Sequence, residues 1–175
     1  MKENTLFSIL CWSHEMNNHV VRKEKIKKLL DKYPEKRNET YSFSSNRGLV
    51  DQEFISEFSK LILPELEEFC KYTEVNIKIT DVWSVTYKKG DHHPVHNHGS
   101  LGLTGILYLD FPKGSSQTFY VQPWNNFVTD TTAYVPTSSS EGDMVITPKF
   151  LSHFSPPQKT NKPKRIISWD MDIVE

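Results

Sequence analysis

The strongest constraint on the fold is a change of hydrophobic period after Thr73. Before this point a segment capped by Asp51 repeats apolar residues at helical spacing, namely Phe54, Ile55, Phe58, Leu61, Ile62, Leu66 and Phe69. After it, Val75, Ile77 and Ile79 alternate with polar residues, as in a strand. Short strands are then predicted at about 75–80, 82–88, 93–98, 102–110, 115–121, 131–135, 143–147, 150–155 and 164–171, with Gly, Pro and Asp turns between them. This spacing predicts a sandwich or jelly roll rather than a parallel α/β sheet.

The first part of the chain predicts elements that support this sheet. They are a strand from Thr5 to Trp12, a helix from His19 to about Tyr33 capped by Asn17 or Asn18, a polar loop from Glu35 to Gly48, and the Asp51 helix with a kink or break at Pro64. Both helices are expected to cover one outer face of the sheet. We therefore predict a mainly β (α+β) single domain, 1–175, with a supporting part at 1–74 and a β core at 75–175.

Charge and cysteine content limit the partners and the location. The net charge is −1, with 21 basic and 22 acidic residues, so no basic field invites a nucleic acid. Cys11 and Cys70 lie far apart in the sequence, and such sparse cysteine use fits a reducing cytoplasm. The apolar run from Leu6 to Trp12 is too short for a membrane span and lacks the flanks of a signal peptide. We expect a cytoplasmic protein without a membrane partner, in which an exposed edge strand can pair two subunits as a homodimer.

A histidine cluster carries the chemistry. The stretch from Gly90 to Ser100 contains four of the seven histidines, and His96 and His98 point to the same side of an extended segment. His153 follows a Gly-Asp turn, an apolar strand and Pro148. Single histidines are usually surface or hydrogen-bonded core residues. Three that converge and leave other coordination positions open are instead typical of a catalytic site for iron, copper, nickel or zinc.

Arg165 lies in the apolar strand Ile166-Ile167-Ser168-Trp169, where an unpaired buried charge is costly. Its partner is either a protein Asp or Glu, or the carboxylate of a small ligand held bidentately. Beside a pocket of three histidines, the small carboxylic acid is favoured.

Together these residues resemble the Fe(II)/2-oxoglutarate-dependent oxygenases with a double-stranded β-helix. Within that group they resemble the prolyl-4-hydroxylase-like oxygenases frequent in marine phage and bacterial genomes. The matching residues are Trp83, Gly90, His96-Asn97-His98, Gly105-Ile106-Leu107-Tyr108, Gly142-Asp143, Pro148, His153 and Arg165. The resemblance covers roughly Trp83 to Asp170 well and the first eighty residues only loosely.

The resemblance implies a role for each residue. His96 and His153 would bind Fe(II), Arg165 would bind the distal carboxylate of 2-oxoglutarate, and Tyr108 would add a hydrogen bond to this co-substrate. Many relatives have a hydroxyl residue two positions after the arginine; here Ser168 follows by three and is the nearest candidate. The reaction would consume O2, convert 2-oxoglutarate to succinate and hydroxylate a C–H bond of an unknown small molecule or protein side chain. The location would be the host cytoplasm if a phage encodes the chain.

Position 98 departs from the family, because His98 stands where relatives have Asp or Glu. His98 is either a third ligand beside His96 and His153, or it hydrogen-bonds nearby while water completes the site. His92 and His93 are expected either at the rim or directly behind the metal ligands. Two alternatives stay open. One is a cupin-type three-histidine metal dioxygenase that does not use 2-oxoglutarate, although the glutamate of cupins is missing between Gly99 and Leu109. The other is a catalytically silent barrel that binds a metal or a small acid.

Overall fold

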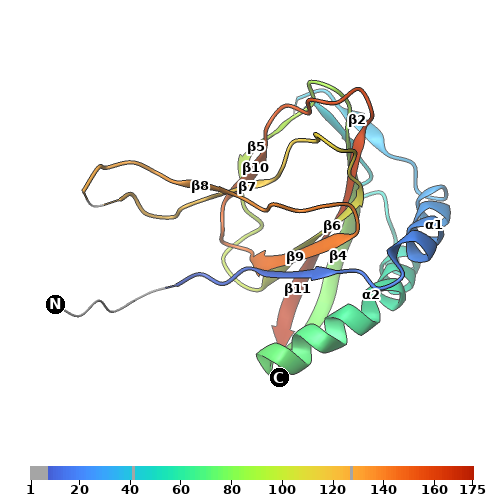
Figure 1. Ribbon diagram of the computed structural model, residues 1–175. Coiled ribbons are helices and arrows are strands. Elements are labelled where there is room, and N and C mark those ends of the chain that lie inside the picture. The colour runs from blue at the N-terminus through green and yellow to red at the C-terminus, as the bar shows by residue number, and fades with distance from the viewer. Residues whose placement is uncertain (1–7, 41, 127) are drawn as a thin grey trace.

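The computed structural model describes residues 8–40, 42–126 and 128–175. The elements are β1 (Trp12–Glu15), α1 (His19–Leu30), β2 (Lys36–Asn38), β3 (Phe43–Ser45), α2 (Gln52–Thr73), β4 (Asn76–Tyr87), β5 (His93–His96), β6 (Leu103–Asp110), β7 (Phe119–Val121), β8 (Tyr134–Pro136), β9 (Asp143–Pro148), β10 (His153–Ser155) and β11 (Lys164–Val174). They form a seven-stranded sheet, β1-β9-β6-β11-β4-β3-β2, and a four-stranded sheet, β5-β10-β7-β8 (Figure 1). All strand pairs are antiparallel. The predicted mainly β jelly roll is confirmed.

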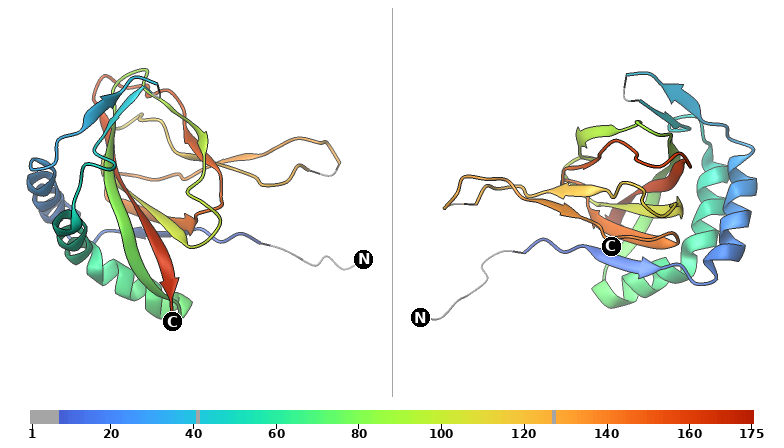
Figure 2. Two further views of the ribbon diagram at one scale, coloured as in Figure 1. Left: turned by 180° about the vertical axis from the view of Figure 1, so that it is seen from behind. Right: turned by 45° about the horizontal axis from the view of Figure 1, so that its top comes forward.

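The helices α1 and α2 cover the outer face of the large sheet (Figures 1 and 2). Alternate residues of β11, namely Ile167, Trp169 and Met171, are buried against them. From the helices this core receives Ile26, Leu29, Leu30, Phe54, Phe58, Ile62, Leu66 and Phe69. The periodicity therefore identified the helical core face correctly.

The intervening residues of β11 face the other way, toward the small sheet. Ile166 packs there in a second cluster with Phe43, Trp83, Val85, Tyr87, Ile106, Tyr108, Tyr120, Val145 and Leu151. Successive side chains of β11 therefore point to opposite faces of the sheet. The inner face carries Lys164, Ile166, Ser168 and Asp170. This inner face is the one that borders the histidines.

One prediction of a loop in the N-terminal part is wrong. The expected loop from Glu35 to Gly48 contains β2 and β3, which extend the large sheet beyond β4. These strands are three residues long and largely polar, so backbone pairing to the edge of β4 forms them without a hydrophobic pattern. At Pro64 we expected a kink or a break; the break is absent, because α2 runs continuously through the proline. Packing of the apolar stripe on both sides of the proline outweighs the lost hydrogen bond.

The predicted side-chain cap forms at α2 but not at α1. Asp51 accepts a hydrogen bond from the backbone N–H of Phe54 at 2.9 Å. Asn18 precedes α1 in a left-handed conformation and makes no side-chain cap, so that predicted cap is wrong.

Of the strand expected from Thr5 to Trp12, residues 5–7 lie outside the described residues, and β1 begins at Trp12. Within the described ranges, no helix is long and apolar enough to cross a membrane.

Candidate metal centre and co-substrate pocket

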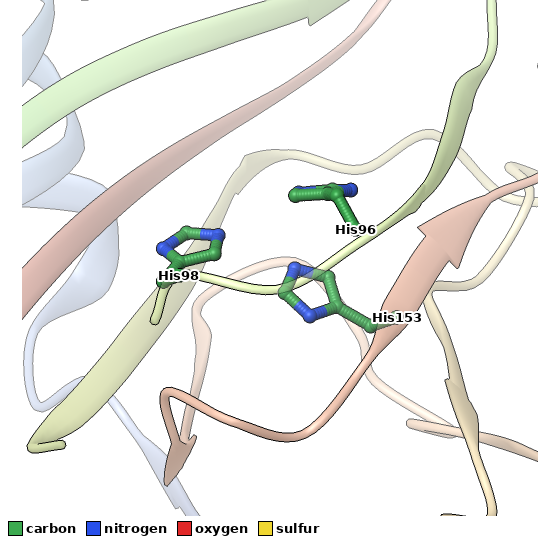
Figure 3. Close-up of side chains that lie close together, drawn as sticks. All are labelled: His96, His98 and His153. Atoms are coloured by element: carbon green, nitrogen blue, oxygen red, sulfur yellow. The ribbon is translucent and has the colours of Figure 1, made fainter. Parts of the chain in front are cut away.

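Three histidines converge between the two sheets (Figure 3). His96 of β5 and His153 of β10 are direct cross-strand partners. His98 lies two residues beyond the end of β5, and its backbone N–H donates to the carbonyl of Lys149 at 2.9 Å. One ring nitrogen of each histidine lies within 4.8 Å of the others. The structure therefore brings together the three residues that the sequence singled out.

Hydrogen bonds on the far side of each ring orient all three imidazoles. Nδ1 of His96 contacts the carbonyl oxygen of Pro94 at 2.8 Å, and Nδ1 of His153 contacts that of Leu151 at 3.1 Å. Nδ1 of His98 contacts a carboxylate oxygen of Asp170 at 2.7 Å. Carbonyl and carboxylate oxygens only accept, so each Nδ1 carries the proton and each Nε2 keeps a free lone pair. This is the arrangement that a metal-binding imidazole requires.

Burial favours the neutral form of His96, His153 and the adjacent His93. Desolvation lowers the pKa of His153 to about 3, and the neighbouring His96 contributes to this shift. Desolvation also lowers the pKa of His96. His93 stacks on the His96 ring at 3.9 Å, and burial lowers its pKa to about 2. Neutral imidazoles are the form that binds a metal ion, so His96 and His153 can bind one at neutral pH.

A cavity of about 590 Å³ opens onto the histidines. Its wall includes Trp83, Tyr87, Ile106, Ser155, Ile166 and Ser168. At its mouth the Arg47 guanidinium lies 4.1 Å over the ring of Trp83, which in turn lies against His98. The cavity therefore has apolar walls on the inner face of the large sheet and a charged rim contributed by β2 and the segment after β3.

Arg165, expected to face this cavity, lies on the opposite face of β11. Its Nε donates to Oγ1 of Thr86 at 2.9 Å, and it approaches Glu35 at 3.7 Å. It lines a separate polar cleft beside α1. The correction follows from strand parity, since Arg165 shares the face of Ile167 and Trp169. Its buried partner is thus a protein carboxylate, the alternative that the sequence left open.

The buried cation on the inner face is Lys164. Its side chain has no solvent exposure. Nζ donates to the Ser155 hydroxyl at 2.6 Å and the Ser116 carbonyl at 3.0 Å, and lies 4.5 Å over the ring of Tyr87. Within the described part of the chain it has no carboxylate partner. Desolvation alone lowers its pKa to about 7. A buried amine without a counter-ion, in contact with two cavity residues, is suited to an anionic ligand.

The other predicted residues take different places. Ser168 lines the cavity. Tyr108 is buried in the inner cluster, donates its hydroxyl hydrogen to Thr137 at 3.0 Å, and is not part of the cavity wall. His93 lines the cavity, whereas His92 is exposed. Asp170, which contacts His98, was not singled out from the sequence. Its place on the inner face of β11 is the only signal that points to it.

The chain matches one protein-family model, described as "Putative 2OG-Fe(II) oxygenase", over residues 81–170, just over half of its length. The chain belongs to this family. A sequence comparison with curated proteins finds no match.

Solved structures show the same fold at low sequence identity. An oxidoreductase of the 2OG-Fe(II) oxygenase family from Burkholderia pseudomallei gives a TM-score of 0.70 at 12% identity, over 93% of this chain and 84% of that chain. The viral collagen prolyl hydroxylase of Paramecium bursaria Chlorella virus-1, in complex with 2OG, gives 0.59 at 17%, over 92% and 94%. HygX from Streptomyces hygroscopicus, with nickel and 2-oxoglutarate bound, gives 0.65 at 10%, over 94% and 83%.

This oxygenase accordingly uses Fe(II), 2-oxoglutarate and O2. The described residues fit both groups, because three free imidazole nitrogens suit iron and an uncompensated buried ammonium suits a dicarboxylate. The dioxygenase that does not use 2-oxoglutarate and the silent barrel are not favoured by the family match.

Proposed function

We propose that this oxygenase is a hydroxylase in which His96, His98 and His153 hold Fe(II) and Lys164 binds the distal carboxylate of 2-oxoglutarate. The observation that carries the proposal is the pairing of three Nε2 lone pairs with a buried ammonium beside one cavity. Lys164 takes the role that the resemblance suggested for Arg165. Ser155, which lies 2.6 Å from Nζ, provides a hydroxyl next to the same carboxylate.

When bound, Fe(II), 2-oxoglutarate and O2 would supply the oxidation: 2-oxoglutarate would become succinate and CO2, and one oxygen atom of O2 would enter a substrate C–H bond. The chain's own residues bind and orient. The hydrogen bonds at Nδ1 fix the three imidazoles before the metal arrives. Tyr87 and Ile166 form an apolar wall that excludes water near Lys164, which strengthens its attraction for a carboxylate.

The substrate is proposed to be a small molecule or a protein side chain that reaches the histidines through the mouth beside Arg47 and Trp83. The charge balance does not indicate a nucleic acid. Cys11 and Cys70 are free thiols, which supports a cytoplasmic location, and a reducing cytoplasm also keeps iron as Fe(II).

Anaerobic titration of the purified protein tests the proposal. Addition of Fe(II) followed by 2-oxoglutarate is expected to produce a visible charge-transfer band that requires both additions, because the two would occupy the same cavity. Exposure to O2 is then expected to yield succinate. Iron binding without any band on addition of 2-oxoglutarate would contradict the proposal and favour a dioxygenase of the cupin type.

The affinity for 2-oxoglutarate is expected to fall as the pH rises above 7. Burial lowers the pKa of Lys164 to about 7, and the dicarboxylate binds the protonated amine. Below this pH the Lys164 amine is already protonated. Above it the amine must take up a proton when 2-oxoglutarate binds, which weakens the binding. The Kd measured from the charge-transfer band should therefore increase about 20-fold from about pH 6.5 to about pH 8.5. A flat profile would show that the amine stays charged throughout or does not contact the ligand.

A further inference from the structure

The replacement of a carboxylate ligand by His98 leaves the proposed metal centre one negative charge short. A neutral imidazole donates a lone pair but brings no charge, whereas an aspartate at the same position would partly neutralise the ion. The nearest negative group on the far side of His98 is the carboxylate of Asp170, whose Oδ1 lies 2.7 Å from Nδ1. The negative charge that the three histidine ligands lack is therefore present on Asp170, on the far side of the His98 ring.

We propose that Asp170 is a positioning residue that supplies this charge to the metal centre through His98. The inference rests on the metal site of the proposed function. A carboxylate that accepts the Nδ1–H of a ligating histidine makes Nε2 a stronger donor and holds the ring in one orientation. His98 and Asp170 together then act as the anionic third ligand that the usual aspartate or glutamate would provide alone.

The strands hold this pair in place. Asp170 lies on the inner face of β11, opposite Thr104 of β6. The Thr104 hydroxyl donates to the carbonyl oxygen of Trp169 at 3.1 Å, so its oxygen remains an acceptor for Nδ1 of His98, also at 3.1 Å. The His98 N–H therefore faces two acceptors and cannot switch to the other tautomer without losing both.

Burial makes the charge effective. The side chains of His98 and Asp170 are only 3% and 10% exposed, so water screens their interaction weakly. The cation facing Asp170 is Arg47, whose Nη2 lies 3.9 Å from Oδ2. Arg47 is 53% exposed and also approaches Asp81 at 3.7 Å. Such a shared and solvated contact neutralises little of the Asp170 charge.

Asp170→Asn tests the inference, because asparagine keeps an oxygen that accepts from Nδ1 and removes the charge. We expect the Kd for Fe(II), measured anaerobically by competition with a chelator, to increase about 10- to 100-fold. The charge-transfer band with 2-oxoglutarate should move to shorter wavelength, since a less electron-rich metal gives up an electron less easily. Asp81→Asn is the matched control: it removes the same charge from the facing strand, next to Arg47 but without contact to His98. It should change the Kd less than about twofold.

Testing Asp170→Asn in a second variant distinguishes a role of Asp170 in charging the metal centre from a purely structural role. In His98→Asp the ligand itself is anionic and no N–H remains for Asp170. Adding Asp170→Asn to this variant should then leave iron affinity unchanged or improve it, whereas a purely structural role would cost the same in both backgrounds. Thermal melting of each apo-protein checks that it folds. If His98→Asp does not fold, the band shift in Asp170→Asn and the Asp81→Asn control test the role of Asp170.

The outcomes separate the two proposals. If the wild-type protein fails to bind Fe(II), the proposed metal site itself is wrong. If the wild-type protein binds Fe(II) and Asp170→Asn binds it equally well with an unmoved band, only the role of Asp170 is overturned. Equal losses on adding Asp170→Asn to the wild-type protein and to the His98→Asp variant would likewise overturn it.

Discussion

Lys164→Met is expected to weaken the binding of 2-oxoglutarate strongly, while Arg165→Met leaves it nearly unchanged. The two basic residues are adjacent in β11 but face opposite sides of the sheet. Lys164 is fully buried beside the cavity without a carboxylate partner among the described residues, whereas Arg165 contacts Thr86 and Glu35 on the helix side. Loss of a buried charged contact to a carboxylate costs about 3 kcal/mol, so the Kd should rise about 100-fold or more.

The measurement is the charge-transfer band of the Fe(II) protein titrated anaerobically with 2-oxoglutarate. Methionine fills a similar volume and removes an uncompensated buried amine, so the apo-protein should melt within a few degrees of the wild type. Iron affinity should also be retained, because Lys164 contacts none of the three histidines. The reverse pattern, with Arg165→Met losing the co-substrate and Lys164→Met keeping it, would restore the assignment suggested by the sequence.

The position of Arg165 on the helix side shows how the alternation of a strand limits a prediction based on motif spacing. The arginine matched the family spacing, and Ser168 was assigned to the same pocket. Residues 165 and 168 are separated by three positions, so in one regular strand they face opposite sides. The apolar alternation of Ile167, Trp169 and Met171, which packs against the helices, assigns Arg165 to the outer face. Applied to the sequence, this rule would have selected Lys164, which shares the face of Ser168.

The three histidines were predictable because each follows a local rule. His96 and His98 are two apart in an extended segment, and His153 begins β10 shortly after Pro148, which ends β9. Asp170 had no such local signal. Its contact with His98 spans 72 residues and depends on how β11 pairs with β6, which the sequence does not specify. The strands β2 and β3 were missed for a related reason, because pairing with the edge of β4 rather than a hydrophobic pattern forms them.

Removal of the third ring, His153→Ala, is expected to weaken Fe(II) binding more than about 100-fold. A metal site held by a few protein ligands gains about 3 kcal/mol from each, which corresponds to a factor of more than about 100. His153 is the cross-strand partner of His96 and is buried, so water cannot replace it at low cost. The matched control is His92→Ala, an exposed histidine of the same cluster in the sequence, which should leave the Kd unchanged.

The same titration resolves the role of His98. If Nε2 of His98 binds iron, His98→Ala should weaken binding about as much as His153→Ala. If His98 only hydrogen-bonds nearby and water completes the site, the loss should stay below about tenfold. The geometry supports the first outcome, because Nδ1 of His98 contacts Asp170 and one ring nitrogen of each of the three histidines lies within 4.8 Å of the others. A small effect at His98 together with a large one at His153 would mean that this oxygenase operates with two histidines alone, and that the carboxylate of the usual triad was lost without replacement.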